Sequence, residues 1–213
     1  MRHIAKREDI RDLILDAVDA LLARYGYRKM TMDDVAREVG IGKGTIYLHF
    51  TGKEELVLAH IDRIAEGVVT GLRAIAGTPS PLDERLRRML ILRVLFRFDS
   101  VLHYSQNLSD LLSAVRPALL VRRQTHFASE AKALEDVLRE GAESGALDCP
   151  DVRTASRALI QGTNSFLPFN LSARELGRRE ELEKQVAAVA GLLIKGLLAC
   201  PKSPARRPRA STR

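Results

Sequence analysis

The sequence of 213 residues contains no tryptophan, few other aromatic residues and only two cysteines. Cys149 and Cys200 have no metal-binding spacing and cannot build a disulfide framework, so we expect neither a metal site nor an oxidising compartment. The longest apolar stretch, residues 186–200, is about 15 residues long and contains Lys195, which makes it too short to span a membrane. The charged start, MRHIAKRED, lacks the apolar segment of a signal peptide. These absences predict a soluble, cytoplasmic protein that has no membrane partner.

The composition is typical of an all-α protein. Apolar residues make up 46% of the chain and charged residues 29%, with many leucines, alanines and arginines and few β-forming residues. The net charge is +7, but residues 201–213 hold five basic residues and no acidic one, which leaves 7 − 5 = +2 for the rest. We expect this basic tail to be disordered. DNA binding therefore has to be inferred from the placement of charges in a motif.

Apolar residues recur at helical spacing along most of the chain. A long helix is expected from Ile10 to Tyr25, ended by Gly26, and another from Lys53 to Ala76. With two short helices between them and five after them, the pattern predicts about nine helices. The last five are expected at Leu82–Val101, Tyr104–Val115, Arg116–Ser144, Asp151–Phe166 and Arg179–Ala199.

The stretch from Thr31 to Lys53 has the pattern of a helix, a glycine-bounded turn and a second short helix. Thr31 and Asp34 form the S/T-x-x-D/E signature of a capping box at the start of the first helix. Gly40 stands where a left-handed residue would end that helix, and the second is expected over Lys43–His49. This is the layout of a helix-turn-helix that reads DNA.

In the second short helix, Ile46 and Phe50 are spaced to anchor it inward, and polar residues are left for the outside. Lysine charges suit phosphates, and hydroxyl and imidazole groups suit phosphate oxygens or base edges. Gly44 has no side chain, so the backbone can approach a duplex closely. We expect Lys43, Tyr47, His49 and Lys53 to serve phosphates and Gly44 and Thr45 to face base edges. The predicted DNA-binding residues are Thr31, Gly42, Lys43, Gly44, Thr45, Tyr47, His49 and Lys53.

From about Ile10 to Leu56, the sequence resembles the N-terminal domain of the TetR family of bacterial transcriptional regulators. The resemblance rests on T-x-x-x-V/I-A, VGIGKGTIY, HF and K-E-E-L, in this order and at the family's spacing. Gly42 stands where many members have serine, so a hydroxyl cap and phosphate contact is absent there. The resemblance implies a DNA-binding domain at 1–52 and a helical ligand-binding and dimerisation domain at 53–200, followed by the tail at 201–213.

The last helix is apolar most of the way round, which requires burial on two sides. The helix before it has small residues at Ala155, Ala158, Gly162 and Ser165, which would let another helix approach. We therefore expect a homodimer formed through the last two helices, as the resemblance also implies. A single, fully buried central helix is the alternative.

Polar and aromatic residues in the middle helices suggest an apolar cavity with a few polar groups, the general form of a small-molecule site. Ordinary core aromatics and exposed polar residues are the alternative for each position. His103 and His126 have no metal-binding spacing. Five arginines, Arg85, Arg87, Arg88, Arg93 and Arg97, predict a solvated face that donates salt bridges. The candidate effector-binding residues are Phe96, His103, Tyr104, Asn107, Arg123, His126, Phe127, Asn164 and Phe166.

The sequence and the resemblance thus predict a ligand-responsive transcriptional regulator. The resemblance favours a repressor, and an activator stays open. The regulator would bind a palindromic DNA operator as a homodimer and be released by a small, largely apolar effector. The alternative is a constitutive or architectural dimeric DNA-binding protein without an effector. No nucleophile elbow, phosphate-binding loop or catalytic carboxylate pair is recognisable, so we expect neither an enzyme nor a cofactor.

Overall fold

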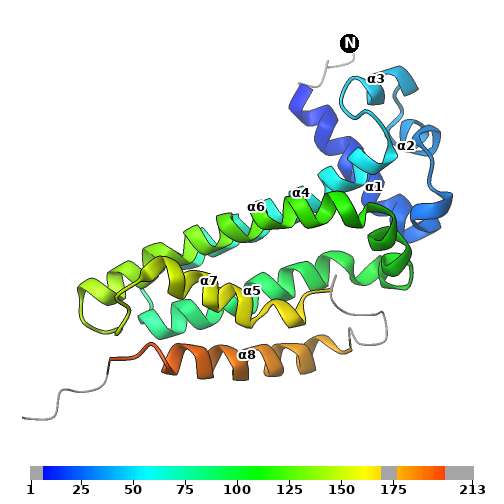
Figure 1. Cartoon of the computed structure of the whole chain (residues 1–213). Coiled ribbons are helices and arrows are strands. Elements are labelled where there is room, and N and C mark those ends of the chain that lie inside the picture. The colour runs from blue at the N-terminus through cyan, green and yellow to red at the C-terminus, as the bar shows by residue number, and fades with distance from the viewer. Residues whose placement is uncertain (1–6, 169–176, 200–213) are drawn as a thin grey trace, which may run out of the picture.

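The computed structural model describes residues 7–168 and 177–199, and in these ranges it is all-helical, as predicted. Figure 1 shows a compact group of helices at one end and an elongated bundle extending from it. The tail at 201–213 lies outside the described residues. No helix in the described ranges is both long and apolar enough to cross a membrane. The elements are α1 (Arg7–Lys29), α2 (Met32–Val39), α3 (Lys43–Tyr47), α4 (Lys53–Ala76), α5 (Leu82–Val101), η1 (Leu102–Asn107), α6 (Leu108–Glu143), α7 (Val152–Gly162), η2 (Asn164–Phe166) and α8 (Arg179–Lys195).

Helices α1 to α3 form the head of the molecule. Ile14, Val18 and Leu21 of α1 are buried and form the floor on which α2 and α3 rest. The predicted stop at Gly26 is a kink with φ 70° and ψ 170°, after which α1 continues to Lys29. A Cβ atom on Gly26 would lie 2.7 Å from Cγ of Asn107, so glycine allows the kink to pack against η1.

Helix α4 joins the head to the body, which consists of α5 to α8 with η1 and η2. It has the predicted bounds and packs against α1, α5 and α6. Its 24 residues span about 36 Å at 1.5 Å per residue. A Cβ atom at Gly67 would lie 2.6 Å from Cζ of Phe96, and one at Gly71 would lie 3.0 Å from Leu92. These glycines let α5 lie close against α4.

One hydrophobic cluster extends across the junction between head and body. It includes Leu21 and Ile46 from the head, Leu56 from α4, and Phe98 and Leu111 from the body. A second cluster fills the far end of the body, where α4, α5, α6, α7 and α8 meet. The head therefore shares its core with the adjacent part of the body.

The prediction of two helices at Tyr104–Val115 and Arg116–Ser144 was wrong, and the described chain has eight α-helices instead of about nine. Residues 102–107 form the 3-10 segment η1, and α6 then runs unbroken for 36 residues with Pro117 inside it. Proline removes one helical hydrogen bond and opposes such a position. Leu111, Val115 and Leu119 are buried on both sides of it, so packing keeps the helix continuous.

The last two predicted helices are also shorter than expected. α7 ends at Gly162 and is followed by the short η2, and α8 ends at Lys195. After α8 the chain pairs with the turn that follows α6, through an isolated bridge between Leu147 and Leu198. Asp148 N donates to Leu197 O at 2.8 Å. These extended backbone hydrogen bonds replace the predicted last turn of helix.

Candidate DNA interface and candidate effector cavity

The turn between α2 and α3 is built as the sequence predicted. Asp34 N donates to the Thr31 hydroxyl at 3.2 Å, and Thr31 N donates to the Asp34 carboxylate at 3.0 Å, which completes the capping box. The Thr31 hydroxyl holds the pKa of Asp34 below its ordinary value. Gly40 is left-handed, with φ 74°, and its N–H donates to Ala36 O. The Thr31 hydroxyl is therefore part of the helix cap, and its contact with DNA stays a prediction.

Helix α3 is anchored by Ile46 and, just after its end, by Phe50, both buried. Lys43, Gly44 and Tyr47 are exposed, whereas Thr45 and His49 are half-buried. Gly42 caps α3 without a side-chain hydrogen bond. The sequence did not single out Leu48, whose side chain is 73% exposed beside these residues. An apolar residue within the polar row, between Tyr47 and His49, was the available signal.

Gly44 lies on the surface of α3, and no side chain of the protein covers it. A Cβ atom built there would meet no other atom within 4 Å. The intramolecular packing therefore does not require glycine at this position. Close approach of a DNA duplex to the helix backbone would be a reason for glycine at this position.

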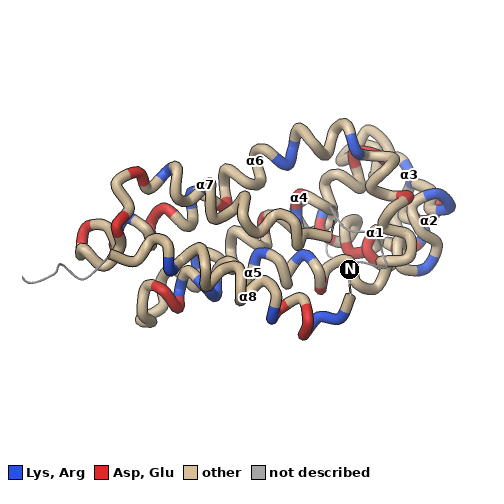
Figure 2. The backbone as a smooth tube through the Cα atoms, turned by 60° about the horizontal axis from the view of Figure 1, so that its bottom comes forward, with Lys and Arg blue, Asp and Glu red and all other residues tan. Residues whose placement is uncertain are grey.

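The two lysines of the motif are placed differently. Nζ of Lys43 lies 2.9 Å from the Asp33 carboxylate, which raises the pKa of Lys43, and both side chains are at the surface. Figure 2 shows basic positions at the end of the molecule where α2 and α3 lie. Lys53 instead donates to Met30 O at 2.9 Å and lies 4.3 Å from the centre of the Tyr27 ring. Burial lowers the pKa of Lys53. Lys53 thus ties the start of α4 to the end of α1, and its phosphate contact stays a prediction.

A cavity lies in the body between α4, α5, η1 and α6, with a volume of about 40 Å³. A water molecule needs about 10–15 Å³ of such space, so the cavity has room for only a few waters. Most of its wall is aliphatic. Its lining consists of Ile61, Ile64, Ala65, Arg97, Val101, Tyr104, Leu108, Leu111, Leu112, Leu119, Arg123, His126, Phe127 and Pro168.

Four of the nine predicted effector residues, Tyr104, Arg123, His126 and Phe127, line this cavity. The other five lie elsewhere among the described residues. Phe96 covers Gly67 and is partly exposed, His103 pairs with Asp19 at 2.8 Å, and Asn107 packs against Gly26. Asn164 accepts a hydrogen bond from Arg93 at 2.9 Å, and Phe166 packs against the core cluster that joins head and body.

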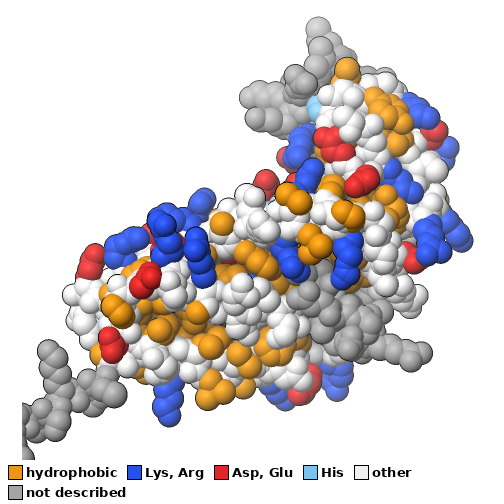
Figure 3. Space-filling view, viewed as in Figure 1, with side chains coloured by type: hydrophobic (Ala, Val, Ile, Leu, Met, Phe, Trp, Pro, Cys, Tyr) orange, Lys and Arg blue, Asp and Glu red, His pale blue; other side chains and the backbone are white. Residues whose placement is uncertain are grey.

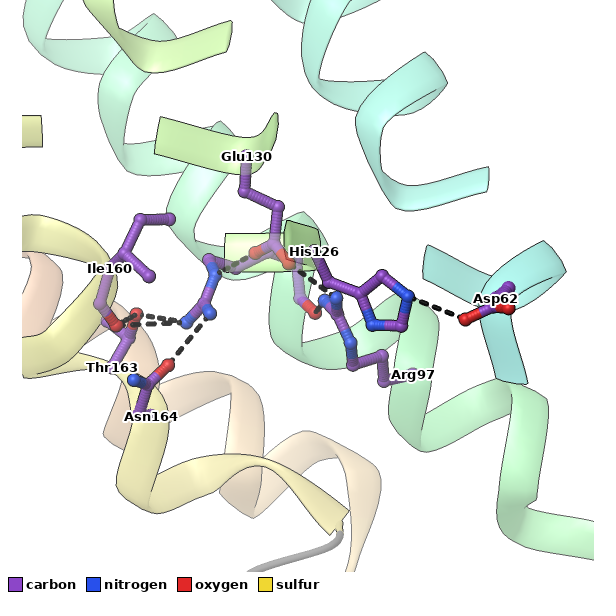
Figure 4. Close-up of polar contacts among 8 residues, drawn as sticks. Asp62, Arg97, His126, Glu130, Ile160, Thr163 and Asn164 are labelled. Atoms are coloured by element: carbon purple, nitrogen blue, oxygen red, sulfur yellow. Dashed lines mark hydrogen bonds and ion pairs between the residues drawn. The ribbon is translucent and has the colours of Figure 1, made fainter. Parts of the chain in front are cut away.

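Sequence reasoning missed Arg97 as a cavity residue, because the arginines of α5 were predicted to form a solvated face. The solvated part of that prediction was wrong for Arg85, Arg93 and Arg97, which are all buried, whereas each of them does donate a salt bridge, as predicted. For Arg93 and Arg97 the reason is Glu130 of α6, which accepts from both guanidinium groups (Figure 4). Arg93 Nε donates to it at 2.7 Å and an Arg97 NH₂ group at 2.5 Å. Because the carboxylate is 33 or more residues away in sequence, helical spacing did not reveal the pairing.

A second ionic group joins α4 to α6. Asp62 lies 2.8 Å from Nε2 of His126 and also pairs with Arg122. Burial alone would raise the pKa of Asp62, but the hydrogen bond from His126 and the charge of Arg122 hold it below its ordinary value. Ala65 and His126 line both the cavity and a neighbouring surface groove between α4 and α6. His126 therefore stands between the cavity and the surface.

A third polar group connects the cavity to the head. The Tyr104 hydroxyl lies 3.3 Å from Nε2 of His60 on α4, and the same Nε2 lies 3.3 Å from the Asp19 carboxylate on α1. Burial raises the pKa of Tyr104 strongly, and the charge of Asp19 adds to this. The neutral phenol thus remains a hydrogen-bonding group at the cavity wall at all ordinary pH values.

Comparison with known proteins agrees with this arrangement. Residues 14–60 match the family model described as bacterial regulatory proteins, tetR family. The regulator YhgD of Bacillus subtilis, named as an HTH-type transcriptional regulator, is 30% identical over 141 residues, which cover 63% of this chain and 72% of YhgD. The HTH-type transcriptional activator FasR of Mycolicibacterium smegmatis is 33% identical over 130 residues, or 59% of this chain. The matched segment spans only 58% of the length of FasR.

The likeness in fold to solved structures covers most of the chain. A transcriptional regulator from Cytophaga hutchinsonii aligns with a TM-score of 0.71 and 21% identity, covering 88% of this chain and 98% of that structure. At this low sequence identity, the match shows a similar fold and nothing about function. The likeness therefore includes the body as well as the helix-turn-helix.

Proposed function

Because the chain belongs to the TetR family of bacterial transcriptional regulators, we propose that it is a ligand-responsive repressor that binds a palindromic operator as a homodimer. A small, largely apolar effector present in the cytoplasm releases it from DNA. The observation that carries this proposal is the course of α4. Its first residue, Lys53, is bound to the head, and its Ile61, Ile64 and Ala65 form a wall of the cavity.

The exposed side of α3 supports the DNA-binding part of the proposal. Thr45 and the bare backbone at Gly44 face base edges, while Lys43, Tyr47 and His49 contact phosphates on either side. Lys43 then exchanges its partner Asp33 for a phosphate. Lys53 contributes to DNA binding by holding the start of α4 against the head. Thr31 and Gly42, the N-cap residues of α2 and α3, present the first backbone N–H groups of these helices to the DNA.

The outer faces of α7 and α8 support the homodimer. Leu192 is 73% exposed, and Ala158, Ala188 and Gly191 are exposed small residues on the same two helices. Figure 3 shows apolar side chains gathered on the face where α7 and α8 lie. Packing this face against its copy would cover Leu192 and place two heads on one duplex, with their reading helices about 34–36 Å apart.

The position of the cavity supports release by an effector. We infer that a ligand larger than the present space pushes α4, which forms one wall of the cavity and carries the head, away from α5 and α6. A changed distance between the two heads lowers operator affinity without any contact between ligand and DNA. By linkage, the operator lowers the affinity for the ligand by the same factor.

A constitutive DNA-binding protein is the second candidate, and the size of the cavity favours it. Ligand sites usually measure about 300–1,000 Å³, whereas this space is about 40 Å³. In that case the body would serve for dimerisation only.

The test begins with selection of genomic fragments by the full-length protein, followed by footprinting of the selected site. We expect protection of two symmetry-related half-sites centred one helical turn apart, bound by one dimer. A metabolite panel is then screened for release of the labelled site. Release by a compound that also raises the melting temperature supports the ligand-responsive repressor, and unchanged DNA binding across the panel supports the constitutive protein.

A further inference from the structure

Basic side chains lie in the wall of the cavity. The described residues that line it include Arg97, Arg123 and His126 but no aspartate or glutamate. Every other lining group among them is apolar except Tyr104. An arginine in the wall of an apolar cavity attracts a negative charge, because an apolar medium strengthens electrostatic interactions.

The carboxylates nearby already have partners. Glu130 is fully buried and serves both Arg93 and Arg97, so these three described side chains carry a net charge of +1 away from water. The remaining partners of Arg93 are neutral oxygens of Ile160, Thr163 and Asn164. Desolvation lowers the pKa of Arg93, and the neighbouring Arg97 charge lowers it further against the effect of Glu130. Guanidinium groups nevertheless stay protonated in proteins, so the excess positive charge persists.

The second carboxylate is shared in the same way. Asp62 pairs with Arg122 and with His126, and therefore supplies no surplus negative charge to the cavity side. Figure 4 shows the Arg97 guanidinium between Glu130 and the His126 ring, and both Arg97 and His126 line the cavity. On the same wall, Arg123 stacks over Phe127, with its guanidinium carbon 5.6 Å from the ring centre.

We propose that the effector is an amphipathic monoanion, an apolar body with one carboxylate, and that Arg97 is the residue that receives the carboxylate. This inference rests on the proposed function for the existence of an effector, and it adds the ligand's chemical class. The carboxylate balances the buried Arg93–Glu130–Arg97 group, while the apolar body lies among the leucines and isoleucines of α4 and α6. Such a ligand exceeds the present volume, so its entry displaces α4.

The test compares probes of one shape and different charge on the full-length protein without DNA. Calorimetry and thermal unfolding are measured with decanoate, decan-1-ol and decylamine at neutral pH, each below its micelle concentration or its solubility limit. A second pair, 2-naphthoate and 2-naphthamide, repeats the comparison with an aromatic body. We expect each acid to bind about tenfold or more tightly than its uncharged partner, as a charge-assisted hydrogen bond would give. Equal or tighter binding of the alcohol or amine, or no binding of either acid, overturns the proposal.

Variants of Arg97 test whether this residue provides the positive charge that binds the carboxylate. Arg97→Gln should abolish the preference for acid over alcohol while leaving decan-1-ol affinity unchanged, since Arg93 and Glu130 then form a balanced pair. Arg97→Lys keeps the charge and should keep the preference. Arg88→Gln is the matched control on the same helix, because Arg88 is exposed and does not line the cavity. If folded Arg97→Gln loses acid binding and alcohol binding equally, Arg97 has a structural role only. That result overturns the proposal that Arg97 receives the carboxylate. If this variant does not fold, the wild-type comparison of acid, alcohol and amine still decides the ligand class.

Failure of this inference is distinguishable from failure of the proposed function. Decanoate that binds without releasing the selected operator supports the anion site and contradicts release by an effector. A neutral compound that binds the cavity and releases DNA supports the repressor and overturns the monoanion.

Discussion

The hydroxyl of Tyr104 lies 3.3 Å from Nε2 of His60, so a side chain of the cavity wall touches a buried side chain of α4. His60 in turn lies 3.3 Å from the carboxylate of Asp19, which belongs to the head. Any ligand that moves Tyr104 therefore acts on the contact between α4 and α1. This short chain of polar groups is a physical link between the cavity and the head.

Tyr104→Phe should weaken that link. Loss of the hydroxyl contact costs about 1 kcal/mol of folding stability, and both DNA and ligand binding should persist. The factor by which a saturating effector lowers operator affinity should shrink about fivefold. Fluorescence anisotropy on the selected operator, with and without effector, measures this factor. Tyr25→Phe, at an exposed tyrosine on α1, is the control, and an unchanged factor in Tyr104→Phe would contradict the link.

Asp19 should contribute to stability in a pH-dependent manner. Burial alone would raise its pKa, but hydrogen bonds and charges from His60 and His103 hold the pKa below its ordinary value. A depressed folded-state pKa means that the contribution is present above the unfolded pKa, about 3.9, and is lost as pH falls through the folded value. Asp19→Asn should therefore be less stable than wild type at pH 6–7, and the difference should vanish near pH 2. Urea unfolding across this range tests the sign, with Asp136→Asn, an exposed carboxylate, as control.

Gly44→Ala separates DNA binding from folding. The new methyl group meets no atom of the protein, and alanine is the better helix former by up to about 1 kcal/mol. The melting temperature should stay the same or rise, whereas operator affinity should fall about tenfold or more, which is 1.4 kcal/mol or more. Thermal unfolding and anisotropy on one preparation give both values. Full operator affinity in this variant would show that the backbone of α3 does not approach the duplex closely.

Lys43→Gln should reduce affinity for all duplexes and lower the slope of log affinity against log salt by about one unit. The fold should be intact, because the lost ion pair with Asp33 is at the surface. Lys132→Gln removes a comparable exposed lysine from the far part of α6 and should leave the slope unchanged. Equal slopes for wild type and Lys43→Gln would exclude a phosphate contact at Lys43.

Leu192→Asp should separate the dimer. The side chain is exposed in one chain, so the folded subunit should change in stability by less than about 0.5 kcal/mol. In the dimer the new carboxylate would be desolvated next to its own copy. Sedimentation should show monomers, and operator affinity should fall because each half-site then binds separately. Val121→Asp alters a similarly exposed residue of α6 and should sediment as wild type; a dimeric Leu192→Asp protein would place the interface elsewhere.

The parts of the fold that the sequence predicted well depend on local chemistry. The capping box of Thr31, the left-handed Gly40 and the start of α4 at Lys53 are properties of a few consecutive residues. The wrong predictions depended on distant partners. Pro117 stays within a helix because Val115 and Leu119 are packed against other elements.

The cavity could be predicted only in part, because its lining also depends on contacts between residues that are distant in sequence. Residue types alone suggested Tyr104, His126 and Phe127, which do converge, but also His103, which turns to Asp19 instead. Burial of the arginines on α5 depends on a glutamate of α6, and helical periodicity carries no information about such a pair.

The hydrophobic cluster that joins Leu21 and Ile46 to Phe98 and Leu111 has a consequence for engineering. A biosensor made by exchanging only residues 1–52 would cut through this shared interior and expose leucines on both pieces. Grafts should therefore carry the matching faces of α4, η1 and the first turns of α6 together with the head. A head that is transferred to another protein must bring the body surfaces that it packs against. No single cut point in the sequence separates these surfaces from the rest of the body.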